Sequence, residues 1–577
     1  YKRQLHSSSG GDILLKAFPF PHRLHIELEA LNKKDYFGDI RYAYKDIALL
    51  RGLTRGVFHN LDNKVLVDPG SSAQYTIEQK DRGLSYGTSN NISSLFLRFK
   101  MPDYPLHLFI DTQLVKREGT TQQRFLSSYL PMNRVSMERG LDWESRTLSI
   151  GTNSHLGPVE IELSHAEKRL DVSGDRLFEN SYGGNIYPHN LLPDLKGSTT
   201  TLKIHTSYTG QIVASATLSR TERENETSGA KADYLAGAAD LQYMPDVRFT
   251  IFLRYRHREA DINNPDYIPV NYLGYSAYAS PLAVRPSIDS TSDSVAGTIR
   301  YRPFKGLTLY GEYSAERIDR RNADQWKLPD ETVRNTLSLS ATLKPLNSLD
   351  LKAKYIHQDI DAPVYNNQPD TSDEGRLYVN WRPSKNISGL FMYSLAFQKR
   401  EELYYIDNNV QIKAEDREVK RERFFGSLTF LITDRLFITP SYSWIHNRTD
   451  QSLAYDSLSS PPDYLVDPDV LYRDSASIYG MNINYIPRER LNLNLDITHT
   501  ISEGRFNPVV ISEINSVKEI ETEADIRETA LAMRADYDLR HGFVAVIRYS
   551  FIDYNDRRDN AQDGRVHLIF ASLSKRW

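Results

Sequence analysis

The stretch that decides the fold is VRFTIFLRYR, residues 247–256. Apolar residues occupy every second position of it, namely Phe249, Ile251, Leu253 and Tyr255. Arginine and threonine fill the positions between them, with Phe252 as the one apolar exception. A period of two is that of a β-strand, whereas an amphipathic helix repeats every 3.6 residues. The stretch therefore predicts a strand with one apolar and one polar face.

The same alternation returns further along the chain, in LTLYGEYS at residues 307–314 and in LNLNLDIT at residues 491–498. The apolar set of the second stretch is Leu491, Leu493, Leu495 and Ile497, and the polar set is Asn492, Asn494, Asp496 and Thr498. Strands of this kind suit a wall that has lipid on one side and water on the other. We expect the leucine set to face lipid and the asparagine set to face a lumen.

Short and long connections alternate between these strands. The short connections centre on Pro245, Pro303, Pro345, Pro383, Asp434, Pro487 and His541. The long ones cover residues 260–290, 361–372, 402–417, 449–471 and 502–523. Bacterial outer-membrane barrels have short turns on the periplasmic side and long loops outside, whereas a soluble β-sandwich has no reason to place every long loop at one end.

Aromatic residues mark the short-turn ends of the predicted strands. Four of them stand two residues before a turn proline: Tyr243, Tyr301, Trp381 and Tyr485. This common offset predicts an aromatic girdle at the membrane interface. The last residues, Ile569, Ala571, Leu573, Lys575 and Trp577, resemble the C-terminal signature of outer-membrane barrels, from which only Lys575 departs.

Composition limits the alternatives. The chain has 577 residues, 36 tyrosines and a net charge of −4, and its mean hydropathy is −0.52. Its longest apolar run, Phe543–Ile547, is far too short for a transmembrane helix, which needs ~20 residues. The near-neutral charge argues against nucleic acid as a partner. No apolar segment follows Lys2 and Arg3, so we expect the chain to be already processed.

The chain contains no cysteine. This excludes disulfides, thiolate zinc sites, iron–sulfur clusters and the C-x-x-C-H attachment of c-type haem. We therefore expect no cofactor in this chain, and any haem must belong to a partner.

Counting hairpins predicts an all-β, closed antiparallel transmembrane barrel. Fourteen strands follow Val247, nine more are readable upstream, and residues 50–90 have room for another hairpin. With both termini periplasmic the number must be even, so we predict 24 or 26 strands, with 26 favoured. The predicted organisation is an N-terminal periplasmic or lumen segment at residues 1–22 and a barrel at residues 23–577. Side chains cannot fill so wide a lumen, so it is either open or plugged by another polypeptide.

The hairpin spacing, together with FHNLDN at residues 58–63 and FLRYRHREADINNP at residues 252–265, resembles the MtrB/PioB family of outer-membrane barrels. Some family members carry an N-terminal C-x-x-C pair, which this chain lacks. The resemblance implies a 26-stranded sheath in the bacterial outer membrane, with a multihaem c-type cytochrome in its lumen and a second one docked outside. It implies a function in electron transfer across that membrane. The alternative is a large solute porin or transporter without a redox partner.

No residue is assigned a catalytic, cofactor-binding or metal-binding role. His257, His357, His446 and His499 lie on predicted strands, but no metal-ligand spacing accompanies them, so we interpret them as solvated lumen or rim side chains. The G-x-S-x-G nucleophile motif is absent, and we do not expect an enzyme. Inward charges of both signs are predicted on two strands: Arg248, Arg254 and Arg256 on one, and Asp350, Lys352 and Lys354 on the other.

Loop and turn composition gives two further expectations. Residues 263–285 carry Tyr267, Tyr272, Tyr275 and Tyr278 among Pro265, Pro269 and Pro281, which could dock an extracellular cytochrome, pack on themselves or join an outer girdle. The long loops hold the acidic residues Asp463, Asp467, Asp469, Glu513, Glu519, Glu521 and Glu523. The short turns hold the basic residues Arg302, Lys305, Lys344, Arg382, Lys385, Arg488 and Arg490. We attribute this asymmetry to divalent-bridged lipopolysaccharide outside and anionic phospholipid inside, in preference to partner docking.

Overall fold

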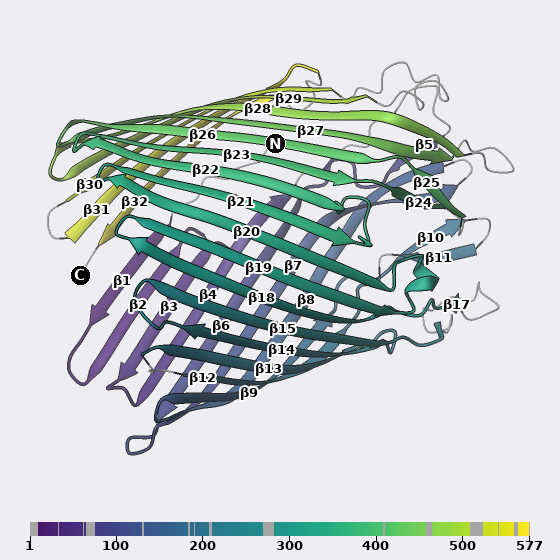
Figure 1. Ribbon diagram of the computed structural model, residues 1–577, viewed down its shortest axis with the longest axis horizontal. Coiled ribbons are helices and arrows are strands. Elements are labelled where there is room, and N and C mark those ends of the chain that lie inside the picture. Colours follow the sequence, from purple (N-terminus) through teal and green to yellow (C-terminus); the bar gives the residue numbers. More distant parts are fainter. Residues whose placement is uncertain are drawn as a thin grey trace.

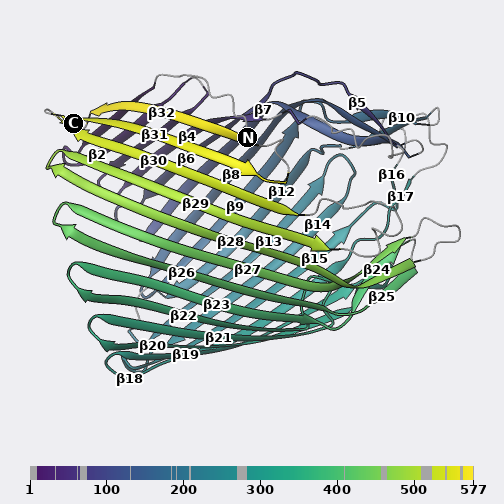
Figure 2. The same cartoon turned by 90° about the horizontal axis from the view of Figure 1, so that it is seen from above.

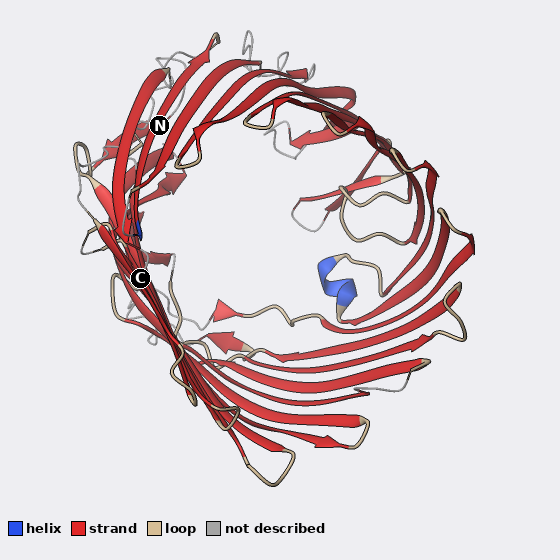
Figure 3. Ribbon diagram, turned by 90° about the vertical axis from the view of Figure 1, so that its left-hand side faces the viewer, coloured by secondary structure: helices blue, strands red, loops and turns tan. Residues whose placement is uncertain are grey.

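The computed structural model describes most of the chain as one wall of tilted antiparallel strands (Figure 1). The described residues run from 10 to 575, without 33, 62, 65–74, 130–131, 183–184, 190, 207–209, 269–281, 408–409, 457–463, 508–522, 540–541 and 559–562. Strands of the near wall cross those of the far wall when the barrel is seen from above (Figure 2). Seen along its axis, the wall forms a ring (Figure 3). The predicted all-β barrel is confirmed.

Twenty-five described strands form this nearly closed wall. The first twelve are β1 (Gly11–Ala17), β2 (His22–Ala30), β3 (Tyr36–Tyr44), β4 (Ala48–Leu61), β6 (Tyr86–Lys100), β7 (Leu106–Tyr129), β8 (Met132–Leu156), β9 (Val159–Val172), β12 (Leu195–Thr206), β13 (Ile212–Asn225), β14 (Lys231–Tyr243) and β15 (Phe249–Asn263). The next seven are β18 (Asp289–Phe304), β19 (Leu307–Arg321), β20 (Glu331–Leu346), β21 (Leu349–Asp361), β22 (Thr371–Ser384), β23 (Ile387–Arg400) and β26 (Arg417–Thr433). The last six are β27 (Leu436–Asp456), β28 (Tyr464–Arg488), β29 (Leu491–Asn507), β30 (Ala524–Asp538), β31 (Phe543–Asp556) and β32 (Gly564–Lys575).

Among the described residues the wall has 25 strands, a number between the predicted 24 and 26. β1 runs toward the short-turn end, as β32 also does, so the first and last described strands point the same way. They lie side by side, but among the described residues no ladder joins them. The first described strand therefore begins at the long-loop end, whereas the prediction began the first strand at the periplasmic end.

The wall also begins earlier than residue 23. β1 pairs with β2 from Gly11↔Ala30 to Ala17↔Leu24, so part of the predicted 1–22 segment is wall. β4, at residues 48–61, is the other strand that the sequence count missed. Its lipid-facing positions include Gly52 and Gly56. Because glycine has no apolar side chain, the alternation of apolar and polar residues is not visible in this strand. The tyrosine ring of Tyr36 takes up the space beside Gly56.

Small elements that are not part of the wall gather at the long-loop end (Figure 1). They are the hairpins β10 (Phe178–Tyr182) with β11 (Asn185–His189), β16 (Tyr267–Ile268) with β17 (Leu282–Ala283), and β24 (Leu403–Asp407) with β25 (Val410–Ala414), and the 3-10 helix η2 (Ala323–Trp326). β5 (Tyr75–Gln79) pairs in parallel with the long upper part of β8. The predicted loop 449–471 is partly strand, since β27 continues to Asp456 and β28 begins at Tyr464.

Strand pairing aligns the apolar positions into one continuous face. Leu495 is paired with Ile483 on one side and with Met533 on the other, and Ile497 with Met481 and Leu531. All four girdle aromatics fall on this face at the short-turn end, and each is 39–45% exposed. The predicted register is confirmed: the apolar face is the outer face, which contacts lipid, and the alternate residues line the lumen.

Candidate functional site in the barrel lumen

The lumen face of β28, β29, β30 and β31 is rich in amide and charged side chains. A hollow of about 480 Å³ is lined mainly by Asn484, Asn492, Asn494, Asp496, Arg534, Asp536 and Arg548. Asn482 donates a hydrogen bond of 2.5 Å to Asp496, and Arg534 forms an ion pair of 2.6 Å with Asp536. This surface is polar over several neighbouring strands, so it is suited to contact water or a polar protein surface.

Charges of opposite sign are paired within the lumen wall. Arg254 on β15 forms an ion pair with Glu312 on β19, and Glu312 also accepts hydrogen bonds of 2.8 Å from Thr298 and from Tyr310. The same kind of pairing recurs along the wall, between Arg256 and Asp240 at 2.8 Å, Arg334 and Glu316 at 2.9 Å, Arg376 and Glu374 at 2.5 Å, and Lys203 and Glu162 at 2.8 Å. This pairing gives the lumen a polar lining in which positively and negatively charged side chains alternate.

The charged residues predicted to point inward lie where expected, and each has its own neighbours. Asp350 pairs at 3.0 Å with Lys344, which lies near the short-turn end of β20. Lys352 lies 5.9 Å from the centre of the Tyr378 ring, and Lys354 is close enough to Glu312 to interact electrostatically with it. Arg248 stands at the short-turn end, beside a hollow of about 400 Å³ that Arg302, Lys305 and Lys344 also line.

A histidine cluster at the short-turn mouth of the lumen was missed by sequence reasoning. Glu160 of β9 contacts His155 of β8 at 3.3 Å and His205 of β12 at 3.0 Å. The ring of His107 on β7 lies 5.8 Å from that of His155. These residues are up to about a hundred positions apart in the sequence, so only the strand register brings them together.

The four histidines weighed from the sequence lie on the other face. His257, His357, His446 and His499 have the parity of the lipid-facing residues and stand above the apolar band. They are therefore rim side chains and do not line the lumen. His499 bonds Thr529 at 2.9 Å, and the ring of His446 stacks on that of Trp444.

Two of these histidines belong to the same repeated arrangement. His257 lies 2.9 Å from Asp293 of the next strand, and Tyr255 donates a hydrogen bond of 2.6 Å to the same carboxylate oxygen. His357, Tyr355 and Asp373 repeat this arrangement at the same distances. In each arrangement one carboxylate oxygen accepts hydrogen bonds from a tyrosine and a histidine. These contacts explain the two histidines as side chains that anchor the wall at the membrane interface. Within the described ranges, no group of three or more histidine or acidic side chains is placed to hold a metal ion.

The long-loop predictions are only partly within the described residues. Tyr267 lies in β16, but Tyr272, Tyr275 and Tyr278 lie outside the described residues, as do Asp463, Glu513, Glu519, Glu521 and Trp577. Asp467 is buried, with 2% of its surface exposed. Glu523 forms an ion pair of 2.5 Å with Arg558.

Comparison with known proteins supports the resemblance over one part of the chain. Residues 199–405 match the model of a family described as an outer membrane beta-barrel porin, MtrB/PioB. That segment covers β12 to β23 and the adjoining hairpin strand β24. No curated protein matches.

Several solved structures are similar in overall arrangement. A mutant of the ferric enterobactin receptor PfeA from Pseudomonas aeruginosa has a TM-score of 0.49 at 11% identity, covering 90% of this chain and 76% of that one. The FrpB iron transporter from Neisseria meningitidis has a TM-score of 0.46 at 10% identity, covering 95% and 87%. The siderophore receptor PirA from Pseudomonas aeruginosa has a TM-score of 0.44 at 12% identity, covering 92% and 80%.

The family match and the barrel together identify a multi-pass protein of the bacterial outer membrane. In the described part of the chain, no helix has the length and apolar character needed to cross a membrane.

Proposed function

We propose that this barrel of the MtrB/PioB type is a non-enzymatic sheath that encloses a multihaem c-type cytochrome and so allows electrons to cross the outer membrane. The observation that carries the proposal is the combination of a wide ring with a polar lining. Twenty-five strands spaced ~4.8 Å apart and tilted by ~40° give a backbone diameter of roughly 50 Å. Wall side chains cannot fill a lumen of that width.

The lining suits a polar protein surface. Arg254 with Glu312, and Arg256 with Asp240, already neutralise one another within the wall. A guest with mixed surface charges can exchange hydrogen bonds with such a lining without leaving a buried ion unpaired. A protein with a polar surface cannot cross ~30 Å of hydrocarbon unaided, and a polar-lined tube removes that obstacle.

The redox groups of such a conduit would come from the partner. A chain without cysteine cannot attach c-type haem, so this barrel would supply only the passage and the orientation of the guest. Electron tunnelling falls steeply with distance, and a membrane core of ~30 Å therefore needs a series of closely spaced haems. A second multihaem cytochrome would dock at the long-loop end, completing the path to an external acceptor.

The test compares the empty barrel with the assembled complex. In a planar bilayer, the isolated barrel should show a very large and poorly selective conductance, and bound cytochrome should close it. Proteoliposomes with the complex should reduce an external acceptor from an internal donor while retaining a small trapped dye. The proposal fails if the barrel alone supports the electron flux, or if the complex leaks dye as fast as the empty barrel. A colourless single-chain preparation without the haem Soret band would favour a solute transporter.

A further inference from the structure

The hollow of about 400 Å³ at the short-turn ends of β15, β18, β19 and β20 has charged residues of one sign only. Four cations and two threonines line its polar part: Arg248, Arg302, Lys305, Lys344, Thr308 and Thr342. Among the described residues, no aspartate or glutamate belongs to this lining. The four cations are all exposed. The hollow is therefore a concentration of accessible positive charge at the periplasmic mouth of the barrel.

Strand register places a row of these polar residues on the lumen side of the wall. The backbone N–H of Arg302 donates to the carbonyl oxygen of Arg248 at 2.8 Å, so the two arginines are directly opposed on β18 and β15. On the following strands Thr308 pairs with Thr342, and Thr342 pairs with Lys352. All five residues alternate with lipid-facing residues of the same strands. The row therefore crosses the lumen face of β15, β18, β19, β20 and β21.

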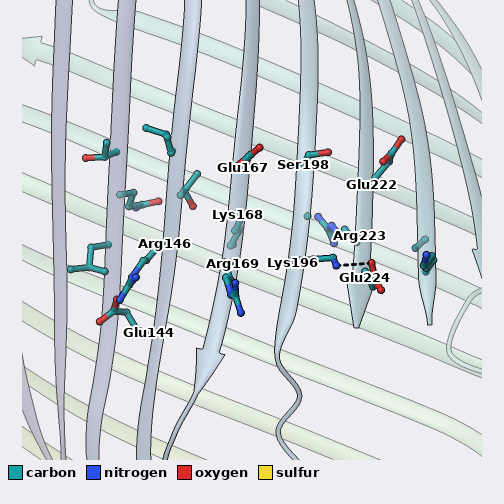
Figure 4. A pocket seen from close by; sticks show the side chains of 18 of the residues that line it. Glu144, Arg146, Glu167, Lys168, Arg169, Lys196, Ser198, Glu222, Arg223 and Glu224 are labelled. Carbon is teal, nitrogen blue, oxygen red and sulfur yellow. Dashed lines mark hydrogen bonds and ion pairs between the residues drawn. The ribbon is translucent and has the colours of Figure 1, made fainter. Parts of the chain in front are cut away.

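Cations elsewhere in the wall have carboxylate partners. At the same end of the lumen, Lys100 forms an ion pair of 2.6 Å with Asp46. On the outer face, Lys196 forms an ion pair of 3.1 Å with Glu224, and Figure 4 shows this pair among charges of both signs. In these places the wall neutralises its own charge, so little positive charge remains for a ligand.

Three of the four cations in the hollow have no carboxylate partner within the described part of the chain, namely Arg248, Arg302 and Lys305. The carboxylate of Asp246 in the adjoining turn accepts hydrogen bonds of 2.7 and 2.9 Å from backbone N–H groups. Of the four cations, Lys344 alone has an ion pair, at 3.0 Å. Like charges directly opposite one another on adjacent strands are unfavourable, so the opposed arginines favour an anion bound between them.

We propose that this basic row is the docking surface for a carboxylate-rich segment of the protein that occupies the lumen. The proposal rests on the proposed function in requiring a protein guest, but it does not depend on haem. Five strands ~4.8 Å apart place the ends of the row roughly 19 Å from one another. That span exceeds the reach of a single phosphate ion and suits an extended run of acidic side chains. The row faces the lumen, whereas the headgroups of membrane phospholipids lie against the outer face.

A docking surface on one side of the lumen also fixes the orientation of the guest. A round tube with a uniform lining does not determine how its guest is rotated about the barrel axis. The basic row occupies only β15 to β21, so an acidic segment of the guest is attracted to that side. The same charge, placed at the periplasmic mouth, draws an acidic guest toward the lumen.

The first measurement is the binding of a fluorescent decaglutamate peptide to the full-length barrel in detergent at low ionic strength. The test variant removes the three cations without an acidic partner: Arg248→Gln, Arg302→Gln and Lys305→Gln. The matched control removes three exposed cations at other short turns: Lys385→Gln, Arg488→Gln and Arg490→Gln. Heat-modifiable gel mobility verifies that each variant is folded.

The triple variant should bind the peptide at least tenfold more weakly than the unmodified barrel, and the control less than twofold more weakly. Decaglutamine should not bind. Neither inorganic phosphate nor phosphatidylglycerol should displace the peptide at an equal concentration of negative charge. Equal losses in the two variants, equal binding of decaglutamine, or displacement by phosphate or by phosphatidylglycerol would each overturn the proposal.

The second measurement uses the complex isolated from its native membrane. Sodium chloride screens ion pairs at an exposed surface, so the guest should leave the triple variant at a lower salt concentration than it leaves the control. Release of the guest from both at the same concentration would overturn the proposal, even where electron transfer through the complex is demonstrated. Absence of any co-purifying protein would overturn the proposed function instead, and the peptide measurement would still decide which ligand the row binds.

Discussion

Gly119 shows how closely two strands approach one another in the upper wall. Its backbone has φ of +136°, and a Cβ added there would lie 2.1 Å from the carbonyl oxygen of Gly87 on β6. Both the backbone conformation and the contact exclude any other side chain unless the strands move apart. Of all residues, only glycine at position 119 is therefore compatible with the pairing Thr88↔Gly119.

Gly119→Ala should destabilise the barrel by about 1–3 kcal/mol, because the added methyl group forces β6 and β7 apart and strains the backbone. The measurement is the temperature at which the folded gel band is lost. The control is Gly375→Ala, at a position where nothing lies within 4 Å of an added Cβ and no positive φ is required. An equal shift for both substitutions would contradict the role given to the close contact.

Leu495→Arg should cost about 2–4 kcal/mol of folding free energy, because it places a charge near the middle of the lipid-facing band. Asn494→Arg should be tolerated, since residue 494 lines a polar hollow of the lumen that also contains Asp496. Heat-modifiable mobility of the two variants gives the comparison. Similar losses at the two positions would show that the faces of β29 are assigned wrongly.

Sequence reasoning was sufficient for residues such as these, whose role follows from their immediate neighbours. The alternation of leucine and asparagine in residues 491–498 identifies the two faces of β29 without any structure. It could not identify Glu160 with His155 and His205, because the contacts depend on the register of three strands. For the four strand histidines it left the lumen and the rim open, and the structure places them at the rim.

At the scale of elements, a buried polar group ties together the extensions of β6, β7 and β8 above the membrane. Asp81, 1% exposed, accepts hydrogen bonds of 2.7 Å from Tyr86 and 2.9 Å from Gln122. Burial alone would raise the pKa of Asp81, but hydrogen bonds from Tyr86, Gln122 and Ser136 outweigh it and lower the pKa below its usual value. The carboxylate is therefore the form that stabilises this region.

Because the folded pKa of Asp81 is lowered, its contribution is fully present above the unfolded value of ~3.9 and is lost as pH falls through the folded pKa. Asp81→Asn should reduce amide protection in residues 80–88 and 119–129 about tenfold at pH 7, a loss of the order expected for a hydrogen bond to a charged group. At pH values below the folded pKa the two proteins should become similar. Hydrogen exchange, corrected for intrinsic rates, provides the measurement, and a difference independent of pH would contradict this assignment.

Most wall strands could be predicted from the sequence, because a lipid face and a water face impose alternation on each strand. β1 and β4 could not: β1 is short, and β4 presents Gly52 and Gly56 on its lipid face. The hairpin β24–β25 was expected to be a loop because it stands outside the membrane, where no alternation is required. Its sequence is instead stabilised by local contacts, such as the ion pair between Lys413 and Glu402.

At the scale of the whole molecule, the ring has one joint of a different kind. Each internal boundary is a ladder of paired residues, whereas among the described residues β1 and β32 are adjacent without a ladder. The even strand number predicted from the sequence assumed that both termini are periplasmic. Strand count is a global property that one missed or short strand changes, so local patterns could not determine it.

Amides of β1 and β32 should therefore exchange with deuterium much faster than those of β20 and β21, which are paired on both sides. The measurement is hydrogen exchange followed by mass spectrometry on peptides covering residues 11–17, 564–575 and 331–361. Protection of the first two peptides equal to that of the third would show that the joint is hydrogen-bonded.

The boundary between β1 and β32, where the described residues form no ladder, also determines where the ring opens under load. Separating two paired strands elsewhere breaks about a dozen backbone hydrogen bonds together, each with a net value of ~0.5–1.5 kcal/mol. Among the described residues no ladder joins β1 to β32, so a load applied from inside is relieved there first. The circumference of the wall can then change at this joint and adapt to whatever occupies the lumen. The joint lies between β1 and β32, the first and last described strands of the wall. The ring can therefore close only after all the strands between them have folded.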